Sequence, residues 1–79
     1  MRIDKFLKVS RVIKRRTIAD EACQNGRVNI NGKVAKSSTN VNIGDIVEVK
    51  FGDKTLKFKV LSLTEHVKKE EASDMIKIL

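Results

Sequence analysis

The sequence is poor in the residues that mark many common sites. Its 79 residues contain no tryptophan, tyrosine or proline, three phenylalanines, one cysteine and one histidine. Phe6, Phe51 and Phe58 all stand in apolar patterns, so we expect no exposed aromatic platform of the kind that stacks on single-stranded bases. One cysteine and one histidine cannot build a zinc site or an internal disulfide. We expect Cys23 to be a small core residue and His66 to be solvated.

Long apolar runs and grouped acids are also missing. No stretch is long enough to span a membrane, and none resembles the hydrophobic part of a signal peptide, so we expect a cytoplasmic protein. The acids Asp45, Glu48, Asp53 and Glu65 are scattered, and no nucleophile–base pair can be placed together from the sequence. These absences favour a binding protein without cofactor or metal over an enzyme.

The sequence does have an excess of positive charge, and this excess lies in its N-terminal half. It carries 17 Lys and Arg against 10 Asp and Glu, a net charge of +7. Residues 1–36 hold ten bases and three acids, and residues 37–79 hold seven of each. All the excess charge therefore belongs to the first half, which indicates a polyanionic partner. The simpler alternative is a basic surface that only confers solubility.

The first half predicts two helices. Ile3, Phe6 and Leu7 share one face of a helix that we expect to break near Ser10, with a tight connection over residues 10–16. Thr17 is predicted to cap a second helix, with Asp20 as a capping-box partner. That helix would have an apolar stripe and end at Asn25-Gly26. The stripe consists of Ile18, Ala19, Ala22 and Cys23.

The remaining residues predict a small, mainly antiparallel sheet. Asn31-Gly32 between residues 28–30 and 33–35 is a strong signal for a hairpin with a type I′ turn. Residues 37–42 read as a loop, and residues 46–51 and 55–63 as strands, with a bulge or strand end near Leu61. Residues 68–75 are predicted as a short helix. The expected fold is a single α+β domain over residues 1–79, with two N-terminal helices packed on the sheet.

A basic cluster precedes the second helix. Arg11, Lys14, Arg15 and Arg16 stand directly before a helix N-terminus, where free backbone N–H groups attract anions. Arginine adds paired donors that match phosphate geometry. Binding to an anionic membrane would need a basic helix with a large exposed apolar face. Because the first helix needs its apolar face for the core, we favour folded RNA, recognised by its shape and its backbone.

Four motifs occur in order along the first fifty residues: Met1-Arg2-Ile3-Asp4-Lys5-Phe6-Leu7, Lys14-Arg15-Arg16-Thr17, Gly26-Arg27-Val28-Asn29-Ile30-Asn31-Gly32-Lys33 and Gly44-Asp45-Ile46. Together they resemble the S-four-type RNA-binding domain, also called the α-L fold. The resemblance covers about residues 1–50, leaving a C-terminal strand and tail over residues 51–79. Domains of this type also occur as appendages of pseudouridine synthases and of a tRNA synthetase, but those enzymes need a separate catalytic domain.

Among stand-alone copies, residues 2–17 and the tail Lys68-Lys69-Glu70-Glu71-Ala72 look most like the RqcP (YabO-type) family of ribosome-associated quality control. The alternative is the heat-shock family of ribosome-recycling proteins, which carries a longer basic C-terminal extension. RqcP-type proteins bind the large ribosomal subunit that holds a stranded peptidyl-tRNA, contact rRNA and tRNA, and help RqcH add alanine tails. The resemblance thus implies a cytoplasmic, ribosome-associated protein, which we expect to be a monomer.

The resemblance and the charge pattern together predict one continuous RNA-binding face. Asp4 is expected to orient neighbouring cations and the first helix rather than to touch phosphate. The alternative is that Asp4 only interacts favourably with the dipole of that helix. For Arg16, the alternative to RNA contact is a structural ion pair with Asp20 or Glu21. The predicted contacts are Arg2, Lys5, Lys8, Arg11, Lys14, Arg15, Arg16 and Thr17, with Lys33 and Lys36 as secondary contacts.

Overall fold

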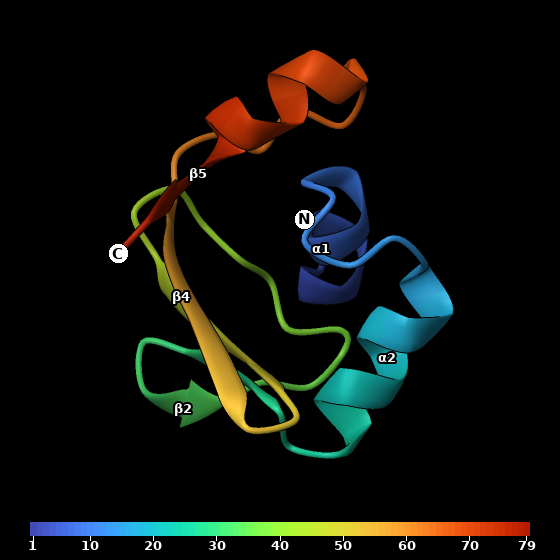
Figure 1. The fold of residues 1–79 in the computed structure, drawn as a ribbon, viewed down its shortest axis with the longest axis vertical. Helices are drawn as coiled ribbons and strands as arrows, with labels where there is room; N and C mark the ends of the chain where they lie inside the picture. Colours follow the sequence, from blue (N-terminus) through green and yellow to red (C-terminus); the bar gives the residue numbers. More distant parts are fainter.

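The computed structural model describes residues 1–79 as two helices lying on one side of a five-stranded sheet (Figure 1). The strand order is β2-β1-β3-β4-β5, and all neighbouring strands are antiparallel. This confirms the predicted α+β class. The elements are α1 (Ile3–Val9), α2 (Arg16–Gln24), β1 (Val28–Ile30), β2 (Lys33–Val34), β3 (Ile46–Phe51), β4 (Lys54–Val60), the 3-10 helix η1 (Lys69–Met75) and β5 (Ile76–Ile78).

The core lies between the helices and the sheet. Antiparallel pairing places Val28 opposite Val49 and Val47 opposite Phe58, and all four side chains are fully buried. The Phe6 ring of α1 stacks on Phe58 with ring centroids 6.2 Å apart. Alternate residues of a strand face the same side, so this register gathers the β-branched side chains against α1. Two of the three phenylalanines are therefore core residues.

Phe51, which also stands in an apolar pattern of the sequence, is not a core residue. It stands at the end of β3 and is 43% exposed. It borders a shallow hollow that Ile18 and Ala22 of α2 also line, and this hollow leaves the ring partly open to solvent. The protein therefore has one half-exposed aromatic ring, too few for a row of stacked bases.

The first helix ends where the sequence predicts. The Ser10 N–H donates to the Phe6 carbonyl, and the Ile13 N–H donates to the Leu7 carbonyl at 3.0 Å, so the chain folds back on the end of the helix. Ile13 is buried and anchors the connection. The chain can therefore leave α1 and approach α2 within a few residues.

The predicted start of the second helix is wrong. Arg15 is the N-cap, in extended conformation, and its carbonyl accepts the Ile18 and Ala19 N–H groups at 3.1 Å. Thr17 lies inside the first turn and makes no capping hydrogen bond. The burial of Ile13 fixes the connection, so the backbone is already helical at Arg16. The predicted apolar stripe is also narrower, since Ala19 and Cys23 are buried but Ile18 is 48% exposed.

Two glycines stand where positive φ is needed. Gly26 has φ +71°, and the N–H groups of Gly26 and Arg27 bond to the Cys23 and Ala22 carbonyls, which closes α2 in a Schellman motif. Asn31 and Gly32 have φ +51° and +84°, as a type I′ turn requires. Both features confirm the sequence prediction.

The C-terminal segment completes the sheet. β4 ends at Val60, where the alternation of apolar residues stops, and the predicted helix over residues 68–75 is a 3-10 helix over residues 69–75. The strand β5 was not predicted; it pairs with β4, with Val60 opposite Ile76. None of the helices has the length and hydrophobicity of a membrane span.

Candidate RNA interface

A buried carboxylate organises two of the predicted RNA-binding arginines. Asp4 lies in the first turn of α1 and is only 3% exposed. Its Oδ2 atom lies 3.1 Å from an Arg2 terminal nitrogen and 3.5 Å from the Arg16 Nε atom. Its Oδ1 atom accepts the Lys5 backbone N–H at 2.8 Å. We call Arg2, Asp4 and Arg16 the Asp4 cluster.

The ion pair predicted as the alternative for Arg16 has the wrong partner. Arg16 pairs with Asp4 rather than with Asp20 or Glu21. Asp20 is occupied elsewhere, because one of its oxygens accepts the Gln24 amide at 3.0 Å and the other accepts the Ser37 hydroxyl. The Arg2 and Arg16 side chains remain 49% and 46% exposed, so both can still donate outward while Asp4 holds them.

Two shallow hollows adjoin the Asp4 cluster. One, of about 300 Å³, lies at the start of α2 and contains Arg2, Arg16 and Thr17 beside the acids Asp4 and Asp20. The other, of about 470 Å³, brings Arg2 and Lys36 together across the loop that follows β2. The structure therefore places four of the predicted contacts, Arg2, Arg16, Thr17 and Lys36, around two hollows that share Arg2.

The thiol of Cys23 borders the second hollow but is 4% exposed. Burial raises its pKa, a hydrogen bond with Ser37 opposes that rise, and the charges of Asp4 and Asp20 add to it. A buried, protonated thiol behaves as a small apolar side chain. This confirms the predicted core role of Cys23, and His66 is exposed as predicted.

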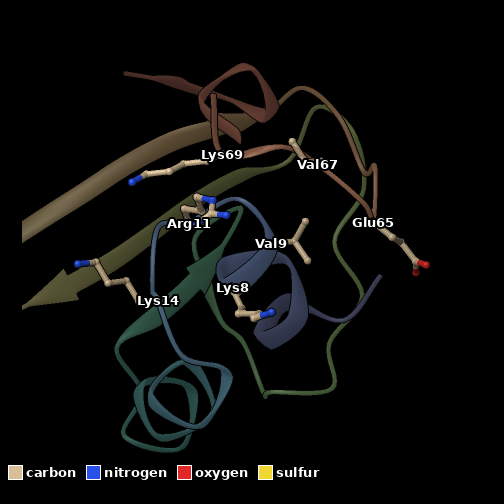
Figure 2. Close-up of a pocket in the computed structure, with 7 residues that line it drawn as sticks. All are labelled: Lys8, Val9, Arg11, Lys14, Glu65, Val67 and Lys69. Carbon is tan, nitrogen blue, oxygen red and sulfur yellow. The ribbon is translucent and has the colours of Figure 1, made fainter. Parts of the chain in front are cut away.

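A second group of cations surrounds a different hollow, of about 440 Å³ (Figure 2). Lys8 comes from α1, Arg11 and Lys14 from the connection to α2, and Lys69 from the start of η1. Glu65 and the half-buried side chains of Val9 and Val67 complete the lining. We call this hollow the Lys69 cleft.

One ion pair ties the C-terminal segment to α1 beside this cleft. The Lys5 Nζ atom lies 3.0 Å from the Glu65 Oε1 atom. The hydrogen bond and the charge of Lys5 lower the pKa of Glu65, helped by His66 and the N-terminus. Lys5, predicted to face RNA, is therefore partly neutralised by a residue of the second half.

The predicted RNA contacts fall into two groups that border different hollows. Arg2, Arg16, Thr17 and Lys36 lie around the Asp4 cluster, whereas Lys8, Arg11 and Lys14 line the Lys69 cleft. Arg15 and Lys33 are exposed outside these three hollows. No three His, Cys, Asp or Glu side chains are grouped so as to hold a metal ion.

Comparison with known proteins matches this fold and these motifs. The S4 domain family matches residues 1–47. Over the whole chain, the protein is 52% identical to the RQC P-site tRNA stabilizing factor of Streptococcus pneumoniae and 53% identical to that of Bacillus subtilis, covering 90% and 92% of those proteins. The chain belongs to the S4-domain family of RQC P-site tRNA stabilizing factors.

Relatives outside this group are more distant. A Heat shock protein 15 homolog of Haemophilus influenzae is 31% identical over 65 residues, which cover 82% of this chain and 50% of that protein. The trimeric structure of Heat Shock Protein 15 from Vibrio cholerae superposes on the whole chain, and on 81% of its own chain, with a TM-score of 0.92 at 26% identity. The solution structure of the hypothetical protein HP1423 has a TM-score of 0.84 at 31% identity, over 100% of this chain and 96% of its own.

The family match covers only one of the two sides of the Lys69 cleft. Every predicted RNA contact, from Arg2 to Lys36, lies within the matched residues 1–47, but Glu65 and Lys69 lie beyond them. These two residues were not among the predicted contacts, because residues 37–79 hold equal numbers of bases and acids and contain no basic cluster. No local signal reveals that a residue sixty positions along the chain pairs with Lys5.

Proposed function

We propose that this protein binds the obstructed large ribosomal subunit that carries peptidyl-tRNA, as a factor of ribosome-associated quality control. It contacts rRNA and tRNA there and supports the RqcH-dependent addition of alanine tails to the stalled chain. The observation that carries this proposal is the identity of about half, over the full chain, to proteins named RQC P-site tRNA stabilizing factor. We propose that the protein acts in the cytoplasm as a monomer.

The proposed RNA contacts are the residues predicted from the sequence, with Asp4 in support. The two groups of cations described above favour phosphate recognition, because both expose guanidinium or ammonium groups at hollows. Asp4 supports contact by fixing Arg2 and Arg16. The proposed contacts are Arg2, Lys5, Lys8, Arg11, Lys14, Arg15, Arg16, Thr17, Lys33 and Lys36.

We further propose that the protein works by binding and carries out no chemistry itself. Asp4, the one buried carboxylate, already accepts hydrogen bonds from Arg2 and from the Lys5 N–H and forms an ion pair with Arg16, so it is a poor candidate for a general base. Turnover of an RNA or aminoacyl substrate by the purified chain would contradict this.

The test is co-sedimentation of tagged protein with ribosomal particles from cells that accumulate stalled ribosomes. We expect enrichment on large subunits that hold peptidyl-tRNA, with RqcH in the same fractions. Deletion of the gene should reduce alanine tails on stalled chains. Equal binding to small subunits would refute the proposal.

Arg16→Ala tests the residue assignment. It should weaken binding to these subunits roughly tenfold, equivalent to about 1.4 kcal/mol. Thermal stability should change little, because a half-exposed ion pair contributes at most about 1 kcal/mol. Arg27→Ala, a matched change at an exposed arginine outside the proposed contacts, should leave binding unaltered. An equal loss in both variants would contradict the assignment.

A role like that of the heat-shock recycling family is the second candidate. The TM-score of 0.92 to Heat Shock Protein 15 favours it at the level of the fold. It predicts binding to free large subunits with a nascent chain and unchanged alanine tailing after deletion. The tailing assay therefore separates the two roles.

A further inference from the structure

The Lys69 cleft joins two parts of the chain that are far apart in sequence. Figure 2 shows α1 and the connection to α2 on one side, and the segment leading into η1 on the other. Four cations line the cleft, three from the first half and Lys69 from the second. The fold thus adds a cation to a group that the sequence assigns to the first half alone.

Charge in this cleft is not balanced within the protein. The three ion pairs of the structure involve none of the four cations. The single carboxylate in the lining, Glu65, already pairs with Lys5. Four cations around one hollow repel each other, and an anion that enters the hollow relieves this repulsion.

The backbone at Arg11 points to a role for its side chain. Arg11 has φ +63° at the position just after the C-cap of α1, where glycine is preferred. Its N–H closes the helix end on the Lys8 carbonyl at 3.1 Å, a bond that glycine would make equally well. An arginine in this strained conformation therefore needs another reason, and its place in the cleft supplies one.

The lining also indicates the class of anion. It contains no aromatic ring that could stack on a base, and its apolar part is limited to two half-buried valines. Lysine and arginine head groups from three elements suit the spread charge of a polynucleotide backbone better than a single compact ion.

We propose that the Lys69 cleft is a phosphate-binding site in which Lys69 acts with Lys8, Arg11 and Lys14 on consecutive phosphates of an RNA strand. The choice of RNA rests on the proposed function, but Lys69 and the C-terminal wall are new to it. The C-terminal segment is then part of the RNA interface and not only scaffold.

Lys69→Gln tests the new residue against Lys68→Gln, a neighbour that is also exposed and carries the same charge but does not line the cleft. With isolated large subunits, Lys69→Gln should weaken binding roughly three- to tenfold, as expected for one charged contact. Lys68→Gln should change affinity less than about twofold. Equal effects in the two variants would overturn the proposal, provided the unaltered protein binds.

A second measurement stands even if the ribosomal role is wrong. Titration of the protein with inorganic pyrophosphate, followed by amide NMR, should shift Arg11, Lys14 and Lys69 before the exposed strand residues Lys54 and Lys57. Uniform shifts at all lysines would contradict a defined site. If the protein failed to bind large subunits but these three residues still shifted selectively, the proposed function would be rejected and the anion site would stand.

Arg11→Gly separates the side chain from the backbone. Because glycine accepts positive φ without strain, Tm should be unchanged or higher. Affinity for large subunits should fall as much as in Lys69→Gln. A lower Tm, or unchanged affinity, would overturn the role given to Arg11.

Discussion

Asp4 shows how one side chain can arrange others. Its carboxylate is buried, yet both arginines that it contacts remain about half exposed. Each guanidinium has five N–H donors, so a contact with Asp4 leaves several donors for an outside acceptor. The carboxylate therefore fixes the direction of the arginines without consuming them.

Asp4→Asn should separate charge from shape. The amide side chain keeps an oxygen for the Lys5 N–H but leaves two neighbouring guanidinium groups without a carboxylate. We expect a loss of about 1–2 kcal/mol in the free energy of unfolding, measured by urea denaturation, since the arginines are half exposed. Large-subunit binding should weaken although the net charge becomes more positive.

Asp53→Asn is the matched control for this change. Asp53 is an exposed acid in the β3–β4 turn, and its loss raises the net charge by the same amount. It should leave stability unaltered and leave binding unaltered or slightly stronger. If Asp4→Asn also strengthened binding, positioning of the arginines by Asp4 would be ruled out.

Glu65 gives a prediction about pH. The hydrogen bond and charge of Lys5, with smaller help from His66 and the N-terminus, hold the pKa of Glu65 below its ordinary value of 4.5. A folded-state pKa below the unfolded value means that the ion pair stabilises the fold above pH 4.5. This contribution is lost as the pH falls through the lowered pKa.

Carboxyl carbon NMR can follow this titration. Lys5→Met keeps the length of the side chain and removes the ammonium, so the pKa of Glu65 should return toward 4.5. A pKa that is unchanged in Lys5→Met would show that the Lys5–Glu65 contact is absent in solution.

At the level of elements, the turns and helix ends that depend on local sequence were predicted correctly, whereas contacts between distant segments were not. Asn31-Gly32 and Gly26 occur where their backbone angles are needed, and these angles follow from the residues alone. The cap of α2 was misplaced because the anchoring of Ile13, a tertiary contact, decides where the helix begins. The strand β5 was missed because Ile76-Lys77-Ile78 is too short to show a pattern, and pairing with β4 defines it.

The segment η1–β5 should prove part of the core. Met75 is 2% exposed and its carbonyl accepts the Leu61 N–H at 2.8 Å, whereas Ile78 is 59% exposed. Met75→Ala should therefore reduce the free energy of unfolding by about 2–4 kcal/mol, and Ile78→Ala by less than about 1 kcal/mol. Urea denaturation monitored by circular dichroism measures both. Equal small losses would mean that the C-terminal segment does not pack on the core.

On the scale of the whole molecule, we propose that residues 1–79 form one cooperative domain. A single cluster of fourteen buried side chains runs from Ile3 to Met75 and includes residues of both helices and of β1, β3 and β4. Domains of this size bury little surface and usually unfold in one step. Thermal unfolding followed at Phe6 and at Met75 by NMR should give one midpoint, and two midpoints would indicate separate units.

The distribution of charge leads to a prediction about salt. If six to eight phosphates are neutralised, the logarithm of the binding constant should fall with the logarithm of salt concentration with a slope of about −5 to −7. Net charge alone does not require such a slope, since only cations at the phosphates release counterions. The slope therefore reports which lysines and arginines touch RNA.

Two variants with equal net charge separate local contact from overall attraction. Glutamine at Lys8, Arg11, Lys14 and Lys69 removes four charges from the cleft, and we expect the slope to become shallower by about 3. Glutamine at Lys54, Lys57, Lys59 and Lys77 removes four exposed charges from β4 and β5 and should leave the slope within about 1 of the original. Equal changes in the two variants would mean that the protein attracts RNA through its net charge, and that the fold does not concentrate binding at the Lys69 cleft.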